Sequence, residues 1–267
     1  EPLAEIMRDM GAALFGVRFV FGFGRALPDG VLDIGEMMRK AGGPGAPSVE
    51  RRGNAADHVA TVTFGQAEGT RQQPLHLRSH NQWIATGLMT LLEARIEHGA
   101  TILSPFSLAG IAGIGAALVP WLLSAGTLHL HHFRDLAGLQ AHIGKAEPEF
   151  ALVPALLAPA LMVVDRPPHV ILAFHRDGRT AGPVAVPDRC RLYDLTSLGD
   201  LTLIARPRQD GASPAALPIG PVCAPSHGPH GPILVETRIN AGVLSVAGPA
   251  VADPGGERLF VGGRAEV

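Results

Sequence analysis

Lysine, tyrosine and cysteine are nearly absent from this sequence. Among its 22 basic residues only Lys40 and Lys145 are lysines, and Tyr193 is the single tyrosine. Chemistry that depends on several lysines therefore has few candidates here. The two cysteines, Cys190 and Cys223, cannot form a disulfide framework and are typical of a reducing compartment. We therefore expect a cytoplasmic protein.

Charge of either sign is also scarce. Charged residues make up 17% of the 267 residues, and the formal net charge is −2. A nucleic-acid-binding protein needs a basic surplus to neutralise phosphates, so we exclude nucleic acid as a partner. The apolar fraction of 46% in a chain of this length is enough to bury a substantial core.

One long segment has no charged residue at all. Between Glu97 and Arg134 there is no Asp, Glu, Lys or Arg. Within this stretch, residues 106–128 form a segment that is long enough to span a bilayer. However, Pro120 interrupts this segment, three histidines follow it, and no cluster of Lys or Arg flanks it. A strand–helix–strand passage inside an α/β domain has the same composition. We therefore predict no membrane span.

Two kinds of pattern follow one another along the chain. Up to about residue 165, apolar strands alternate with longer helical segments, which is typical of βαβ units. The predicted strands are 59–64, 101–104, 127–133 and 150–153, and the predicted helices are 81–97, 111–123 and 135–143. Ser79 is a better cap than His80 for the first of these helices, and Asp135 caps the last. After residue 166, short strands lie between Gly- and Pro-rich turns. The sequence predicts an α/β fold: a mostly parallel sheet with flanking helices (1–165), followed by a β-rich subdomain (166–267).

A resemblance to a known family runs along most of the chain. Residues 57–83, DHVATVTFGQAEGTRQQPLHLRSHNQW, resemble the strand, phosphate loop and following strand of adenylate-forming enzymes, which include acyl-CoA synthetases, adenylation domains and luciferases. Later blocks are similar to family motifs in the same order: residues 103–128, FALVPALLAPAL (150–161), LYDLTSL (192–198), GVLSVAGP (242–249) and LFVGGR (259–264). The resemblance implies part of the family's large domain, without the lid domain that follows it there.

The resemblance also assigns the positions of a nucleotide site. It identifies residues 62–80 as the phosphate-loop segment and Tyr193 as the residue that stacks on adenine, although a buried aromatic at a strand end explains Tyr193 equally well. The implied nucleotide-binding residues are Gly65, Gly69, Thr70, Tyr193, Thr196 and Asp253. If the chain is an active enzyme, the implied catalytic residues are Arg71, Thr196 and Asp200.

Several charged groups that the family's chemistry needs are missing. Adenylation joins a carboxylate to the α-phosphate of ATP, and Mg²⁺, lysines and N–H groups meet the negative charge that develops. The loop 65–74 contains no lysine, and Glu68 places a negative charge where the triphosphate would lie. At about 4 Å and a surface-like dielectric, that repulsion costs a few kcal/mol. Arg71 replaces the lysine only in part, and Ser197 stands where the family has its Mg²⁺-binding glutamate.

These departures favour a non-catalytic or strongly diverged relative that acts as a partner-binding or ligand-binding subunit. An acyl group or adenine is the candidate ligand, and we predict no cofactor and no metal ligand. The alternative is an active ATP-dependent acyl-adenylate or acyl-CoA ligase that uses Arg71, Asp200 and Asp253, or a lysine from a partner chain. AMP, ATP and Mg²⁺ are implied only by that alternative.

Two further patterns concern partners and metals. Residues 110–123 carry Gly, Ala and Leu on all sides of the predicted helix, which is typical of an element without a solvated face. We therefore predict a homo-oligomer or a complex with a second subunit, with residues 108–123 at the contact. His129 and His131 share one face of a predicted strand. Two imidazoles can bind a metal, but the sequence indicates no third ligand.

Overall fold

The structure is a computed structural model of the chain. It describes residues 2–14, 16–24, 26–41, 54–64, 75–132, 135–176, 182–214, 216–227, 231–240, 242–252 and 258–260. The chain divides into two compact units, Glu1–Arg52 and Gly53–Val267. Each unit is described by itself.

The first unit is small and buries very little. Its elements are α1 (Pro2–Ala13), β1 (Val20–Gly22), β2 (Val31–Asp33) and α2 (Ile34–Lys40), and the two strands pair in parallel. Asp33 begins α2 by accepting hydrogen bonds from the backbone N–H groups of Gly35 and Glu36. Gly11 is the only buried residue in the described part of this unit.

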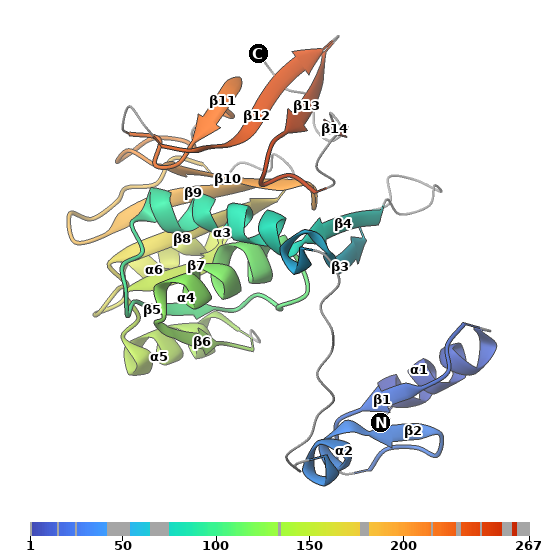
Figure 1. Cartoon of the computed structure of the whole chain (residues 1–267). Helices are drawn as coiled ribbons and strands as arrows, with labels where there is room; N and C mark the ends of the chain where they lie inside the picture. The colour runs from blue at the N-terminus through green and yellow to red at the C-terminus, as the bar shows by residue number, and fades with distance from the viewer. Residues whose placement is uncertain are drawn as a thin grey trace. The chain divides into compact units, whose positions relative to one another are not determined.

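A six-stranded sheet forms the centre of the second unit (Figure 1). In spatial order its strands are β10 (Thr202–Pro207), β9 (Arg191–Leu198), β8 (Val170–Arg176), β7 (Phe150–Pro154), β5 (Thr101–Ser104) and β6 (Thr127–Leu130). All neighbouring strands are parallel except β9 and β10, which form an antiparallel hairpin. The predicted α/β fold with a mostly parallel sheet is confirmed.

Helices cover both faces of this sheet. One face packs against α3 (His80–Ala94), the π-helix η2 (Ile111–Leu118) and α4 (Val119–Ser124); the other packs against α5 (Leu136–Ala146), the 3-10 turn η3 (Ala155–Leu157) and α6 (Ala158–Met162). Side chains alternate between the faces of a strand. Leu172 of β8 therefore joins the core on the α3 side, and Ile171 joins the core on the α5 side.

The antiparallel part of the unit begins later than the sequence suggested. Its sheet contains β11 (Gly220–Cys223), β12 (Ile233–Asn240), β13 (Val243–Ala247) and β14 (Arg258–Phe260). The predicted β-rich C-terminal part is thus present, but β8, β9 and β10 lie after residue 165 and still belong to the six-stranded sheet. Val235 and Val246 share a core with α3, so the antiparallel sheet packs on the same helical layer.

Two helix starts were predicted from single residues, and both are confirmed. Ser79 caps α3 in a capping box, in which its hydroxyl accepts from the Gln82 N–H and its own N–H donates to the Gln82 side chain. Asp135 caps α5 by accepting from the Gly138 N–H at 2.6 Å. The predicted helix at 111–123 is present as η2 followed by α4.

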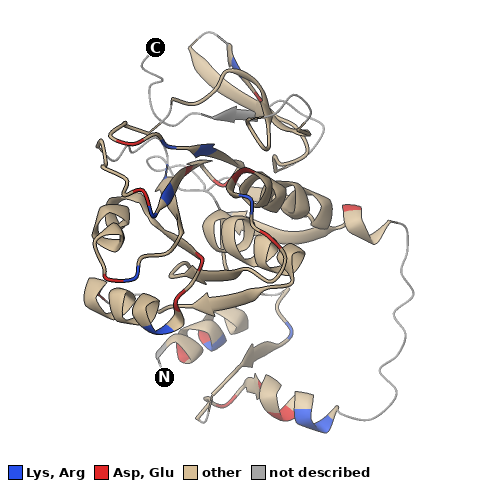
Figure 2. Cartoon of the chain, turned by 90° about the vertical axis from the view of Figure 1, so that its left-hand side faces the viewer, with Lys and Arg blue, Asp and Glu red and all other residues tan. Residues whose placement is uncertain are grey.

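Part of the uncharged segment packs into the core of the second unit. Ile111, Gly113, Ala116 and Ala117 are buried, because η2 lies against α3 and the sheet. Among the described residues, no helix combines the length and the apolar character that crossing a membrane requires. Figure 2 shows the Lys and Arg residues of the described part spread over several elements rather than gathered on one.

A matched pair of glycines tests the packing of the helical layer. A Cβ at Gly87 of α3 would lie 2.3 Å from Cγ1 of Val119 in α4, whereas a Cβ at Gly144 of α5 would meet nothing within 4 Å. We expect Gly87→Ala to lower the free energy of unfolding by about 1–3 kcal/mol. Gly144→Ala should raise it by about 0.5–1 kcal/mol, since alanine is the better helix former. Urea denaturation of the two variants checks both signs; equal effects would contradict this packing.

Candidate nucleotide-site region

The resemblance places the candidate site where parallel strands end. In open α/β sheets, ligands bind beyond the carboxyl ends of the strands. Of the residues predicted from the sequence, Tyr193, Thr196 and Asp200 lie in the described part of the chain. The other predicted residues lie outside it: Gly65, Gly69, Thr70, Arg71 and Asp253.

The predicted strand–loop–strand segment is an antiparallel hairpin. Its strands β3 (Val59–Phe64) and β4 (Leu75–Ser79) pair with Val62 opposite Leu77, and a short 3-10 turn, η1 (Ala55–Asp57), precedes them. Residues 65–74 connect these two strands in the sequence. Trp83 of α3 fixes the hairpin by donating from Nε1 to Thr61 Oγ1 at 2.8 Å.

Arg78 joins this hairpin to the turn after β9. Its side chain is fully buried, and its guanidinium lies over the ring of Trp83 at 4.6 Å from the centroid. It also donates a hydrogen bond to the backbone carbonyl of Asp200. The structure therefore brings the turn that contains Asp200 to the end of β4.

Helix α3 fixes a third segment at the same place. Gln82 Nε2 donates to the Val251 carbonyl at 2.7 Å. The single proton of the Thr86 hydroxyl is shared between the Gln82 carbonyl at 2.8 Å and the Ala250 carbonyl at 3.2 Å. Thr202 of β10 donates to the same Ala250 carbonyl at 3.0 Å. The chain just before residue 253 is thus held against α3 and β10, beside the β9–β10 turn. The hairpin, the turn and this segment are the three parts of the chain that the resemblance assigns to a nucleotide site.

The last residues of β9 itself, 196–198, carry no carboxylate. Ser197, which corresponds to the family's glutamate, is 1% exposed, and its hydroxyl donates to the His175 carbonyl at 3.3 Å. Thr196 is half-buried and lies opposite Ile204 of β10. Mg²⁺ takes oxygen ligands and is usually bound through one or two carboxylates. Ser197 does not provide one, and the next carboxylate along the chain is that of Asp200, in the turn after β9.

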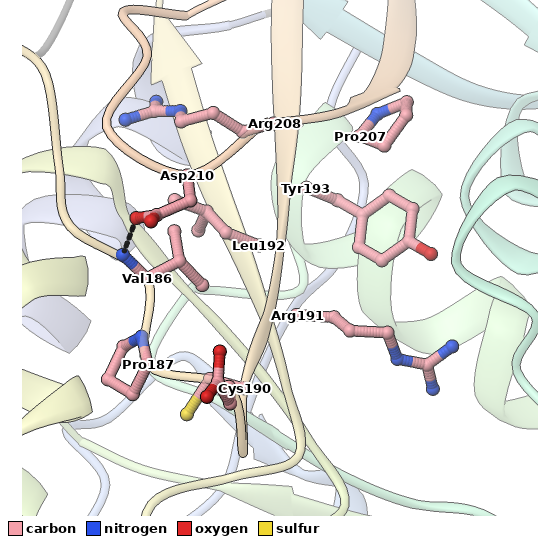
Figure 3. A pocket seen from close by; sticks show the side chains of 10 residues that line it. Val186, Pro187, Cys190, Arg191, Leu192, Tyr193, Pro207, Arg208 and Asp210 are labelled. Atoms are coloured by element: carbon pink, nitrogen blue, oxygen red, sulfur yellow. Dashed lines mark hydrogen bonds between the residues drawn. The ribbon is translucent and has the colours of Figure 1, made fainter.

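Tyr193 is a core residue. It is 8% exposed and packs with Leu195 and Leu203 on the α3 side of the sheet. It also borders a cavity of about 310 Å³ between β9, the end of β10 and residues 186–190. Figure 3 shows Tyr193 and Arg191 on one side of β9 and Arg208 and Asp210 on the other. This cavity lies at the amino end of β9, and Thr196 and Ser197 lie toward the other end of the strand.

Asp194 of β9 forms a buried network of charged and polar side chains that the sequence did not predict. Asp194 Oδ1 lies 2.6 Å from His175 Nε2 of β8, and Arg208 donates to both carboxylate oxygens, at 2.8 Å to Oδ2 through Nε. All three side chains are buried. Burial by itself raises the pKa of Asp194, but the hydrogen bonds from His175 and Arg208 and their charges outweigh it, so the pKa is lowered. The signal in the sequence was an acid within an apolar strand, at the position of the glycine in the family's Y-G-x-T-E motif.

His129 and His131 lie close to a third histidine, His142 of α5. His129 and His131 lie at the end of β6, and the ring of His142 in α5 lies 5.8 Å and 5.2 Å from theirs, between centroids. In the part of the chain that the structure describes, no group of three or more His, Cys, Asp or Glu side chains is arranged as a ready metal site.

Comparison with known proteins identifies the fold. The sequence matches no protein-family model and no curated protein significantly. Solved structures match nearly the whole chain. One match is the N-terminal subdomain of Klebsiella oxytoca NpsA in complex with anthranilyl-AMSN, with a TM-score of 0.57 and 16% identity. The match covers 100% of this chain and 73% of the NpsA chain. A variant of E. coli MenE with bound OSB-AMS has a TM-score of 0.57, 12% identity and coverages of 97% and 52%.

The fold is that of the adenylate-forming enzymes. A luciferase-like enzyme from the mealworm Zophobas morio agrees, with a TM-score of 0.58, 15% identity and coverages of 91% and 59%. The resemblance predicted from short sequence blocks is therefore confirmed for the fold. The chain spans about half the length of the MenE chain, at 52%.

The Asp194 network predicts a specific pH dependence. A carboxyl group whose pKa is lower in the folded than in the unfolded state stabilises the fold above its unfolded pKa, and this stabilisation is lost as the pH falls through the folded pKa. Asp194→Asn should lower the free energy of unfolding by about 3–5 kcal/mol at pH 7, because it leaves Arg208 buried and unpaired. The difference from wild type should shrink below about pH 4. Urea denaturation at pH 7 and pH 3 tests this; a difference independent of pH would contradict it.

Proposed function

We propose that this chain uses the fold of adenylate-forming enzymes to bind a ligand or a partner and does not form adenylates. The observation that carries the proposal is the end of β9. There Ser197 is buried, and its hydroxyl is bonded to a backbone carbonyl. An adenylating site needs a carboxylate for Mg²⁺ at this point, because the metal must neutralise charge on the transferring phosphate. Ser197 does not fit that ion, and the carboxylate of Asp200 stands in the turn after the strand.

The scarcity of lysine supports the same conclusion. The sequence has two lysines, and Lys145 lies in the last turn of α5, which packs on the sheet face opposite α3. The hairpin and the segment before residue 253 both contact α3. Lys145 is therefore on the wrong side of the sheet to neutralise a phosphate at the hairpin. Glu68 in the connecting loop adds negative charge to that region of the sequence.

Solved relatives indicate the class of ligand. The NpsA subdomain is in complex with 3-hydroxybenzoyl-AMSN in one structure, and MatB from Rhodopseudomonas palustris is bound to ATP in another. The framework around the corresponding region is retained here through Arg78, Gln82 and Thr86. We therefore propose an acyl group or an adenine-containing molecule as the ligand.

An active ligase is the alternative, and Asp200 is the residue that favours it. Asp200 is half-buried, and its turn is held next to β4 by Arg78. If its carboxylate holds Mg²⁺, then metal and nucleotide must bind together. This requirement separates the two functions without an assay of the complete reaction.

The first test compares nucleotide binding with and without the metal. Calorimetric titration with ATP should give the same weak affinity in Mg²⁺ and in EDTA, and Asp200→Ala should change neither value. ATP–pyrophosphate exchange should stay at the level of a protein-free control. Micromolar ATP affinity that requires Mg²⁺ and is lost in Asp200→Ala, or exchange that is lost in Arg71→Ala, would establish the ligase instead.

A partner role is favoured by the exposed helix of the first unit. In α1 and just after it, the apolar side chains of Leu3, Ile6, Met7, Met10 and Leu14 are exposed; Leu3 is 71% exposed. The predicted contact at residues 108–123 exposes less apolar surface, because η2 is mostly buried. The main exposed apolar residues of this segment are Leu122 and Leu123 of α4. A second copy or another subunit covers α1 in this proposal.

Light scattering with a matched pair of variants tests the partner role. At micromolar concentration the wild-type chain should have a molar mass above the 27.9 kDa of a monomer, either alone or after the partner subunit is added. The double change Ile6→Glu, Met10→Glu should reduce it to a monomer, because charge in an apolar contact is costly. Leu122→Glu should leave the assembly intact. A monomeric wild type without any partner, or dissociation by Leu122→Glu alone, would contradict this contact.

A further inference from the structure

Two histidine rings form a hydrogen bond between the end of an edge strand and a helix. His131 follows β6, and its N–H is bonded to the Ser104 carbonyl of β5 at 2.9 Å. His142 lies in α5, and the Nδ1 atoms of His131 and His142 are 3.0 Å apart. The ring of His129, in β6, stands edge-on to that of His142 at an interplanar angle of 89°. All three rings are half-buried.

The fold brings these rings together from both sides. Residues two apart in an extended chain point to the same side, which places His129 and His131 together. Helix α5 is held on the sheet by Leu139 and Ile143, which are fully buried. His142 lies one residue before Ile143, so the bond between the two rings adds a polar link to an otherwise apolar contact between α5 and the sheet.

We propose that the His131–His142 contact is a pH-sensitive switch, which holds α5 against the end of β6 at neutral pH and releases it in acid. A hydrogen bond between two imidazole nitrogens needs a proton on one nitrogen and a lone pair on the other. The bond therefore forms when both rings are neutral or when one of them is protonated. When both rings are protonated, each Nδ1 atom is a donor, and two positively charged rings lie in contact.

The surroundings of His142 oppose its protonation. Burial, followed by the charges of His131, His129 and Lys145, lowers the pKa of His142 from 6.5. Lys145 lies one turn beyond His142 on the same helix.

The other elements on α5 do not offset these positive charges. Strand β7, the turn η3 and helix α6 contain no titratable side chain. The acids at the two ends of α5 are engaged elsewhere: Asp135 caps the first turn, and Glu147 pairs with Arg166.

The direction of the switch follows from this difference in proton binding. Once α5 separates from β6, His142 binds a proton with the ordinary pKa of about 6.5. The closed contact is therefore complete above about pH 6.5 and weakens as the pH falls through the lowered pKa of His142. The inference is independent of the proposed function, since the histidines lie at the β6 edge of the sheet and β9 lies near the other edge.

Hydrogen exchange of the α5 amides at pH 7.5 and pH 5, corrected for the intrinsic rates, tests the switch in the full chain. In the wild type the opening equilibrium of α5 should rise severalfold at pH 5. Protonation of one histidine with a pKa of about 6.5 limits the rise to about thirtyfold over this range. The amides of α3, which covers the other face of the sheet, should show no comparable rise. NMR titration of the imidazole signals should give His142 a pKa below about 6.5.

Four variants separate this contact from a general effect of acid. His142→Asn should abolish the rise, because an amide does not titrate in this range, and His131→Asn should reduce it. Lys145→Gln should also reduce it, since protonated His142 is then opposed by one charge less. His132→Asn changes the exposed neighbour of His131 and should keep the full rise.

The proposal is overturned if α5 opens no more at pH 5 than at pH 7.5 in the wild type, or if α3 opens equally. It is also overturned if His142→Asn keeps the full rise, or if His142 titrates above pH 6.5. If circular dichroism shows that His142→Asn is unfolded, His131→Asn decides: a full rise in that variant counts against the switch.

Discussion

Strand β9 is covered on both faces, and much of the second unit depends on this constraint. It pairs with β8 and β10 at its two edges, and its residues 192–195, 197 and 198 are buried. A polar side chain in such a strand must find a partner inside the protein, because water does not reach it. Asp194 therefore pairs with Arg208 and His175, and the Ser197 hydroxyl bonds to a backbone carbonyl.

The burial of β9 is part of the fold, whereas adenylation chemistry depends on particular charged side chains. The chain has the fold of an adenylate-forming enzyme, and within it Arg78, Gln82 and Thr86 connect the hairpin, the β9–β10 turn and the segment before residue 253. We propose that the groups that would meet a triphosphate differ from those of the family, as at Ser197. A glutamate in its place would be a buried charge and would need a metal or a cation beside it. A fold can persist while the site on it changes, because packing and catalysis rest on different residues.

The sequence predicted those features that depend on neighbouring residues. Ser79 and Asp135 mark helix starts through contacts only three residues away, and the alternation of strands and helices predicts the parallel sheet. Distant contacts were missed. Residues 177–190 connect β8 to the parallel strand β9 without a helix in their described part, so the pattern favoured a separate β-rich region. The pairing of Asp194 with Arg208, and of His131 with His142, depends on how strands and helices pack, which local periodicity does not record.

Hydrogen exchange along β9 tests the central claim most directly. If the end of this strand is a buried structural element and not a metal-binding one, the amides of residues 193–197 should exchange only through global unfolding. Adding ATP and Mg²⁺ should leave their exchange rates unchanged. Fast exchange at residues 196 and 197 that becomes slow when Mg²⁺ and ATP are added together would contradict the account, because it would show that this strand end opens to bind the metal–nucleotide complex.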